Sequence, residues 1–330
     1  MSQLVDSQLD GSTGILLAPV KGKDERRTLP QNLFAKRPSI FTAKFVLALV
    51  LVAAVWTVVA LDPTWWVIAP AVIINGLLYA HLVELQHECL HEHAYTRRWL
   101  NRAAGFAAGV PMLSSYWHYK HDHLRHHAFL GTPQNREFFN YRFERLGTFP
   151  GFVRGAYHLG RYVDVLKEIA RSLAGLTNPN VTKAVAAKKI RTEYRLFALV
   201  IAAAVVFSVL AQSYYLLFVW VLPMLLVAEP THFLIELPEH FGLNTQSNPD
   251  VLSNTRTVTA GRFARWFTNG NDVHTAHHFH QGVPMVNVRQ LHGIIEERIE
   301  AVSRSYWDFY SGVFTGRISY QSADEYCMTR

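Results

Sequence analysis

The sequence predicts an all-α integral membrane protein in which four transmembrane helices form two hairpins and a cytosolic helical cap completes the fold. Three observations predict it: four apolar segments, a short link within each pair, and the near absence of cations from the segments. We place the segments at residues 40–61, 64–83, 196–212 and 214–229. Each is about long enough to cross a hydrocarbon core of roughly 30 Å, and in lipid only helices or closed barrels satisfy the backbone.

The sequences of the two links predict tight turns. Leu61-Asp62-Pro63-Thr64 separates the first pair and Ala211-Gln212-Ser213-Tyr214 the second. Lys44 lies near the start of the first segment, where its long side chain can reach the interface. Four buried helices of a soluble protein are the alternative, but such helices rarely occur as two hairpins from which Lys and Arg are so nearly excluded.

The basic charge marks an orientation. Of the 32 Lys and Arg residues, which give a net charge of +7, seven lie in residues 1–44, seventeen in 87–195 and eight in 255–330. Every cation therefore lies on one side of the two hairpins, as the positive-inside pattern requires. We expect both termini and the central region to face the cytoplasm, across the inner membrane if the source is a bacterium. Gly14–Val20 is too short and too poorly flanked for a signal peptide.

The remaining chain divides around the membrane segments. We expect a cytosolic N-terminal tail over residues 1–39, a membrane domain over 40–292 and a cytosolic C-terminal segment over 293–330. A further apolar run, Ala103–Tyr116, is interrupted by Pro111 and is too short to span a bilayer, so it favours an interfacial or cap helix.

Eight of the 17 histidines fall into three tight groups. Residues three or four apart share one face of a helix, so the members of each group can converge. The groups are His87 and His91, then His123, His126 and His127, then His274, His277 and His278. Eight of the other nine histidines are interpreted as ordinary core or surface imidazoles: His81, His93, His118, His121, His158, His232, His280 and His292.

Grouped imidazoles indicate a metal centre. Two cysteines, Cys89 and Cys327, exclude a disulfide framework, a four-cysteine zinc site and a cysteine-ligated iron–sulfur cluster. Eight nitrogens exceed the needs of one metal, because zinc takes three or four protein ligands and octahedral iron at most six. Two iron ions with positions left open for dioxygen fit this ligand set better than two zinc ions.

The histidine groups resemble the boxes of the membrane fatty acid desaturase and hydroxylase superfamily, the integral-membrane non-haem diiron enzymes. The resemblance runs from about Phe41 to His292 in order, spacing and membrane placement. Three further stretches resemble family signatures: Thr96-Arg97-Arg98-Trp99-Leu100-Asn101, Glu239-His240-Phe241-Gly242 and Asn254-Thr255-Arg256-Thr257.

This resemblance implies both the ligands and the reaction. The eight grouped histidines would inherit the iron-ligand role, and His240 stands where related enzymes supply a ninth histidine. Reduced iron and dioxygen would remove hydrogen from an unactivated carbon of a lipid or fatty acyl chain. Loss of a second hydrogen gives a double bond, whereas return of oxygen to the carbon gives an alcohol.

Three carboxylates are candidates for orienting the ligands. Glu84 lies three residues before His87 and shares its helical face, although a carboxylate at the aqueous end of a span is an equal alternative. Glu236 lies four residues before His240, which would put the two on one helical face. Pro238 between them can interrupt such a helix. Asp272, with Asn271, can anchor the third box, but a helix N-cap is the more ordinary role.

Subfamily features favour desaturation over hydroxylation. The first box has the shorter His-x3-His spacing, unlike the acyl-CoA desaturases of the stearoyl type, and together with Asn254–Thr257 it is similar to acyl and sphingolipid desaturases. Hydroxylation of an alkyl, fatty acyl or other lipid chain is the alternative on the same scaffold. With no fused cytochrome b5 evident, electrons would come from a separate donor of the ferredoxin, rubredoxin or cytochrome b5 type with its reductase.

Other functional classes explain fewer residues. His87-Glu88-x-x-His91 also fits an intramembrane zinc metalloprotease with Glu88 as general base and Asp250 as a third ligand, but six histidines then stay idle. A metal receptor or transporter would favour polar residues near the bilayer midplane. The basic stretch 183–195 suits anionic headgroups or an acidic donor, and nucleic acid is an improbable partner for a membrane cap.

The distribution of cations predicts a topology that can be measured. A compartment-sensitive reporter fused after Arg330 should read as cytoplasmic in intact cells. An external reading would contradict the orientation.

Overall fold

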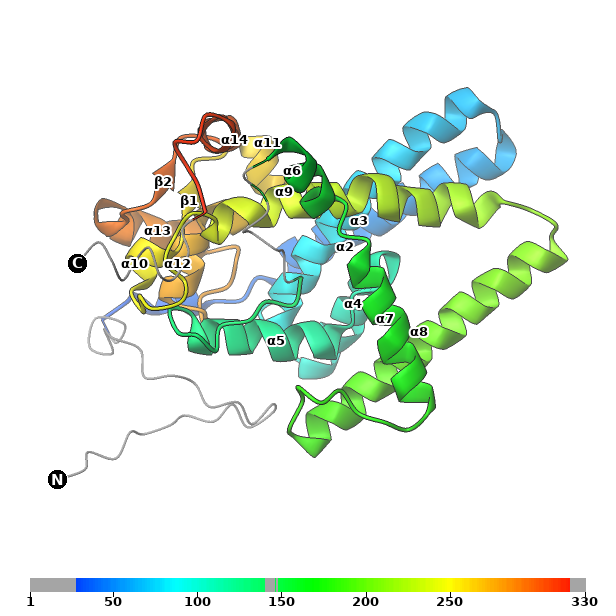
Figure 1. Ribbon diagram of the computed structural model, residues 1–330, viewed down its shortest axis with the longest axis horizontal. Coiled ribbons are helices and arrows are strands. Elements are labelled where there is room, and N and C mark those ends of the chain that lie inside the picture. Colours follow the sequence, from blue (N-terminus) through cyan, green and yellow to red (C-terminus); the bar gives the residue numbers. More distant parts are fainter. Residues whose placement is uncertain (1–27, 140–145, 147, 321–330) are drawn as a thin grey trace. The chain divides into compact units, whose positions relative to one another are not determined.

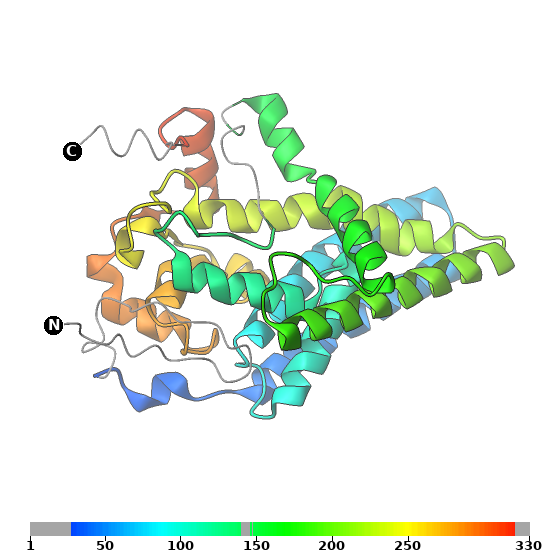
Figure 2. The ribbon, with the colours of Figure 1, turned by 60° about the horizontal axis from the view of Figure 1, so that its bottom comes forward.

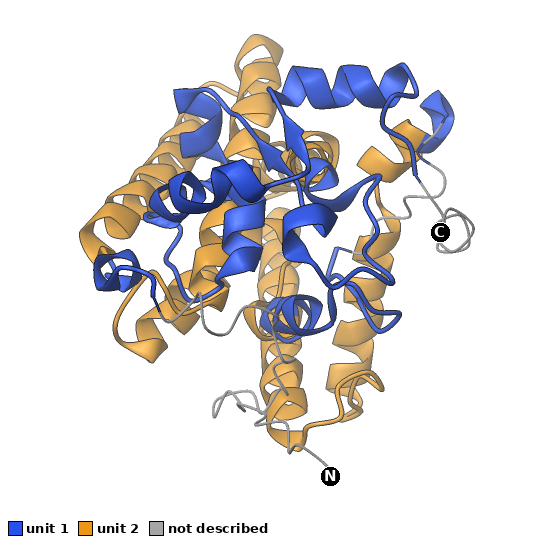
Figure 3. Ribbon diagram, turned by 90° about the vertical axis from the view of Figure 1, so that its left-hand side faces the viewer, with its two compact units in different colours: residues 1–36, 119–151, 236–330 blue, residues 37–118, 152–235 orange. Residues whose placement is uncertain are grey.

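The computed structural model describes residues 28–139, 146 and 148–320. Most of the expected N-terminal tail, residues 1–27, and the last ten residues lie outside this described part. The chain forms two compact units, residues 1–36, 119–151 and 236–330 in the first and residues 37–118 and 152–235 in the second. Figure 3 colours the two units separately.

The second unit contains the expected membrane helices. Helix α2 (Pro38–Leu61) and helix α3 (Trp65–Leu90) form the first hairpin, and α8 (Ala184–Leu210) begins the second. The fourth helix continues through two π-helical turns, η4 (Leu217–Val221) and η5 (Met224–Ala228), into α9 (Glu229–His240). Figure 1 shows α8 and this fourth helix diverging from their connecting turn. All four are long and apolar enough to cross a membrane, which confirms the predicted fold class.

The helices extend beyond the predicted apolar segments at their polar ends. Helix α3 continues past Val83 to Leu90, so His87 lies on the helix and His91 is its C-cap. Helix α8 begins twelve residues before Leu196, and α9 continues through Pro238 to His240. Hydropathy measures only the part of a helix that needs lipid, whereas packing against other helices continues the hydrogen-bonded ladder into the cap.

A polar network joins three of the spans within the apolar region. The Val219 carbonyl accepts hydrogen bonds from Asn75 Nδ2 at 3.2 Å and from the Tyr79 hydroxyl at 2.6 Å. The Trp56 indole donates to the Tyr79 hydroxyl at 3.0 Å. Because lipid offers no water, a carbonyl displaced by a π-helical turn needs such partners.

Span α8 also holds the start of the helix that carries the second histidine box. Helix α5 (Tyr116–Phe129) begins where the buried Glu193 carboxylate accepts from Ser115 Oγ at 2.6 Å and from the Trp117 amide at 2.8 Å. The carboxylate thereby serves as the N-cap group of α5, although it comes from a distant segment. Next to it, His118 Nδ1 lies 2.7 Å from the Tyr194 hydroxyl.

Shorter elements surround the spans in the second unit. The expected helix over the run 103–116 is α4 (Arg98–Gly109) followed by η2 (Val110–Met112). Helix α7 (Gly160–Leu173) packs beside α8 and follows α6 (Phe149–Ala156), whose last residues belong to this unit. Figure 2 shows α7 alongside the lower-numbered half of α8.

The first unit is built around the third histidine box. Its elements are η1 (Gln31–Phe34), α10 (Val251–Asn254), α11 (Arg262–Phe267), η6 (Asn271–Val273), α12 (His274–Phe279), α13 (Val288–Ile295), η7 (Glu296–Arg298) and α14 (Tyr306–Phe314). Strands β1 (Thr257–Val258) and β2 (Val302–Ser303) pair in parallel. Leu33 from η1 joins the hydrophobic cluster behind α12, and the Asn287 amide donates to the carbonyls of Leu33 and Ala35.

Gly76 lies where two spans pack closely together, so a larger residue at this position should lower the stability of the fold. A Cβ added to Gly76 would lie 2.3 Å from Val227 Cβ and 2.8 Å from the Pro223 carbonyl. Gly76→Ala should therefore destabilise the fold by about 1–3 kcal/mol through overpacking, read as a lower thermal midpoint in detergent. Gly293 in α13 has open space at its Cβ position, so Gly293→Ala should raise the midpoint slightly. Equal shifts of the same sign would contradict the close packing.

Candidate metal centre

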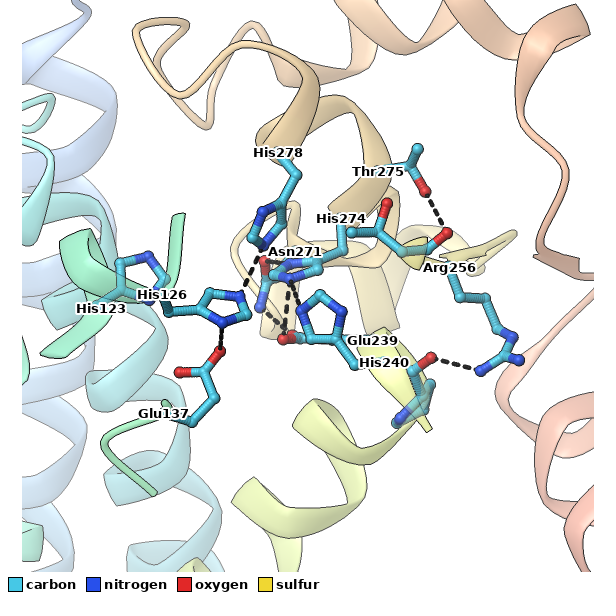
Figure 4. A network of polar contacts seen from close by, with 12 residues as sticks. His123, His126, Glu137, Glu239, His240, Arg256, Asn271, His274, Thr275 and His278 are labelled. Carbon is cyan, nitrogen blue, oxygen red and sulfur yellow. Dashed lines mark hydrogen bonds and ion pairs between the residues drawn. The ribbon is translucent and has the colours of Figure 1, made fainter. Parts of the chain in front are cut away.

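Four buried histidines of the first unit converge on one point. They are His126 on α5, His240 at the end of α9, and His274 and His278 on α12. One ring nitrogen from each lies within 4.8 Å of the others. We call this set the four-histidine cluster. Figure 4 shows the rings of all four turned toward a common centre.

Hydrogen bonds to the outer ring nitrogens orient three of these side chains. His126 Nδ1 lies 2.7 Å from Glu137 Oε1 and 2.8 Å from Asn135 Oδ1. His240 Nδ1 lies 3.1 Å from the Asn254 carbonyl, and His274 Nδ1 lies 2.9 Å from Asn271 Oδ1. Acceptors at Nδ1 favour the tautomer that carries its proton there and leaves the Nε2 lone pair for a metal.

Those Nε2 atoms meet inside the cluster. His126 Nε2 lies 3.2 Å from His278 Nε2, and His274 Nε2 lies 3.2 Å from His240 Nε2. Burial, with smaller contributions from neighbouring histidines, lowers the pKa of His278 well below its ordinary value of 6.5. His278 is therefore neutral at physiological pH, as a metal ligand must be. Converging neutral imidazoles are the donors that a divalent transition metal such as iron prefers, so these residues fit the expected metal.

The segment after α9 holds His240 in place. Arg256 donates from Nη1 to the carbonyls of Pro238 and Phe241 at 2.8 Å each, and its own amide donates to the Glu239 carbonyl at 2.8 Å. A cation at the C-terminus of a helix binds carbonyls that lack intrahelical partners. The stretch Asn254–Thr257, which was matched to a family signature, thus has a structural role: it fixes the end of α9.

A carboxylate lies beside the same cluster. Glu239 Oε2 lies 3.2 Å from His274 Nε2, and the Asn271 amide donates to Glu239 Oε1. Glu137 supplies a second carboxylate through His126. Two negative charges next to neutral imidazoles favour a bound cation.

A second group of histidines lies on the same two helices. His123 and His127 on α5 approach to 3.0 Å between their Nε2 atoms. The His277 ring centroid on α12 lies 4.7 Å from that of His127 and 5.9 Å from that of His123. One nitrogen from each of the three lies within 4.8 Å of the other two. We call this set the three-histidine group.

The first box lies in the other unit. His87 and His91 come together at the end of α3, with ring centroids 5.2 Å apart. His87 is buried, and His91 is half-buried as the first residue beyond the helix. The predicted convergence within each of the three boxes is therefore present in the structure.

The predicted supporting carboxylates have different surroundings. Glu84 is buried, with Oε1 3.8 Å from His232 Nε2. Glu236 precedes His240 by one helical turn on the continuous helix α9. Asp272 is buried with Oδ2 3.6 Å from both Arg265 Nε and Arg289 Nη2. Burial raises the pKa of Asp272, and the two arginines act against that shift.

The acceptors Glu137 and Asn135 were not predicted from the sequence. They lie in an irregular segment after α5, where no periodicity relates them to the box. Glu239 was named only as part of a stretch that resembles a family signature, and no role was predicted for it. Asn271, three residues before His274, was noted as an anchor, and its side chain does bond to that histidine.

Four membrane-spanning helices and two sets of converging histidines define a membrane protein equipped to hold metal ions. A model of the fatty acid desaturase family matches residues 63–310. The chain is also 22% identical over 294 residues, covering 83% of this chain and 82% of the other, to the sn-1 oleoyl-lipid 12-desaturase of Picosynechococcus sp.. The chain belongs to the fatty acid desaturase family, which confirms the resemblance. It is a membrane oxidoreductase of lipid metabolism.

The anchoring of His274 can be tested by removing its acceptor. Asn271→Ala deletes the partner of His274 Nδ1 and frees the imidazole to rotate. Metal affinity at the four-histidine cluster should fall by about 10–100-fold, measured by Co²⁺ titration followed in the visible spectrum. Asn244→Ala, in an exposed-loop hydrogen bond with Ser247, is the matched control and should leave the titration unchanged. Unaltered affinity in Asn271→Ala would contradict the anchoring role.

Proposed function

We propose that the protein is an O2-dependent diiron desaturase of a fatty acyl chain carried by a lipid. The observation that carries the proposal is the orientation of the Nε2 atoms in the four-histidine cluster. Three outer acceptors fix the imidazoles so that their lone pairs point inward. Such an arrangement has no packing advantage and suits a metal ligand.

The proposed ligands divide between two iron ions. His126, His240, His274 and His278 would hold one ion. His123, His127 and His277 would hold the other. His87 and His91 of the first box are proposed as iron ligands as well. Glu239 stands at 3.2 Å from His274 Nε2 and would balance the charge of the first ion.

Bound iron would supply the reduction of dioxygen and the removal of two hydrogens from adjacent carbons. The overall reaction joins the two lost hydrogens, two electrons, two protons and O2 to give a double bond and two waters. The chain contributes neutral ligands, which keep the bound metals electrophilic, and a buried site that excludes water. A separate protein would donate the electrons.

A lipid-borne acyl chain is the proposed substrate class. The family supports a lipid substrate, and the named relative acts on an oleoyl lipid. The supporting roles of Glu84, Glu236 and Asp272 are proposed as well, with Glu84 acting in the neighbourhood of His87. The cytoplasmic position of the site remains part of this proposal and rests on the distribution of cations.

Metal content tests the ligand assignment. The purified protein should contain about two irons per chain, and His126→Ala or His277→Ala should each lower that content and abolish turnover. His158→Ala, outside both histidine sets, should keep the iron and the activity. One zinc without iron in the parent protein would contradict a diiron centre.

The reaction is tested by the products formed in a host. Cells expressing the parent chain should accumulate acyl chains with an additional double bond, and cells expressing His277→Ala should not. Lipid mass spectrometry with ozonolysis would locate the bond and identify the lipid class. Accumulation of hydroxylated chains in place of unsaturated ones would contradict desaturation.

A further inference from the structure

Helix α7 presents three different faces. Its buried face, which includes Val165, Glu168 and Ile169, packs in the second unit. A second face is apolar and exposed, and a third is charged and exposed. The apolar stripe is Leu159, Val163, Leu166, Ala170 and Leu173, spaced at three and four residues, with Leu166 at 57% and Leu173 at 62% exposure.

The charged face adjoins the apolar stripe. Asp164, Lys167 and Arg171 each follow a stripe residue directly, so they lie about 100° round the helix from it. Lys167 Nζ bonds to Asp164 at 2.9 Å, and Arg171 pairs with Glu168. A helix with an apolar side, a charged side and low overall hydrophobicity is the type that lies in a membrane interface.

The C-terminal end of α7 is tied to the boundary of one span. Arg195 Nε donates to the Ser172 carbonyl at 2.8 Å, and Arg191 Nη1 donates to the Gly175 carbonyl at 2.7 Å. Leu196, the next residue after Arg195, begins the uncharged apolar part of α8. The end of α7 therefore lies at the depth where α8 passes from polar surroundings into hydrocarbon.

The N-terminal end of α7 is tied to the boundary of another span. The Arg161 guanidinium pairs with the Glu229 carboxylate, with Nη2 at 2.7 Å and Nε at 3.2 Å from Oε2. The Tyr162 hydroxyl donates to the same oxygen at 2.8 Å. Glu229 ends the apolar segment 214–229, so this end of α7 lies at the polar boundary of the fourth span.

A helix fixed at both ends to the polar boundaries of two spans runs along the membrane surface. Helix α7 has 14 residues, or about 21 Å at 1.5 Å per residue. We propose that α7 lies in the headgroup region of the bilayer, with the stripe Leu159–Leu173 in contact with the upper acyl chains. Its charged face then points to the phosphates and water.

Charge on the adjoining segments fits a phospholipid surface. Residues 149–195 carry nine cations and three carboxylates, the cations being Arg154, Arg161, Lys167, Arg171, Lys183, Lys188, Lys189, Arg191 and Arg195. Lys167, Lys183 and Lys188 are exposed. Cations next to an exposed apolar stripe contact phosphate while the stripe enters the acyl region. The bilayer is the occupant that the depth of both helix ends favours over a second protein.

Site-directed spin labelling of the full chain in phospholipid nanodiscs tests this placement. Cys327→Ser provides a background in which the remaining cysteine, Cys89, is buried. Labels at Leu166→Cys and Val163→Cys should collide with oxygen several-fold more than with a water-soluble nickel chelate, relative to a label at Asp164→Cys. Leu199→Cys, exposed on the apolar part of α8, gives the value for full lipid contact.

Three results would overturn the proposal. Equal nickel accessibility at Leu166 and Asp164 would place the stripe in water. Dipolar broadening between labels of two copies would assign the stripe to self-association, and protection that needs an added electron-transfer protein would assign it to a partner. The second stripe position, Val163, keeps the test valid if a label at Leu166 lowers the thermal midpoint. The measurement does not involve oxidation of a substrate, so it stands apart from the proposed desaturase activity.

Discussion

The need to give the outer nitrogens of buried imidazoles hydrogen-bond acceptors governs the organisation of the first unit. A ring that is buried and neutral still has one N–H donor and one lone pair, and each unsatisfied group costs about 1–3 kcal/mol. Glu137, Asn254 and Asn271 accept from the outer nitrogens, and the inner nitrogens face one another. The irregular segments around α12 are therefore the means by which the acceptors reach the rings.

Charged side chains likewise satisfy backbone groups at the helix ends. Arg256 binds the free carbonyls of α9, and Glu193 binds the free amide at the start of α5. The helix that carries the second histidine box thus begins, and the helix that carries His240 ends, against a charged side chain from elsewhere in the sequence. Charged groups at these positions complement the helix dipole and fix the axial position of the ring on the helix.

Sequence periodicity was sufficient for the spans and the boxes, since both depend on spacing within one helix. The four apolar helices and the convergence of His274 with His278 follow from residue intervals alone. Contacts that join distant segments have no such signal. Glu137 reaches His126 from an irregular segment, and Val219 exposes its carbonyl because the helix takes π-helical turns that no local pattern predicted. The extension of α3 to Leu90 was missed because hydropathy identifies only the part of a helix that lies in lipid.

The short helix η1 is held in the first unit by residues that lie far along the chain. Asn287 binds the carbonyls of Leu33 and Ala35 across 254 and 252 residues, and Leu33 packs in the cluster behind α12. His126 and His278 are likewise separated by 152 residues. Contacts of such long sequence separation form late in folding. Every residue from Leu33 to Asn287 must therefore have left the ribosome before this cluster can close.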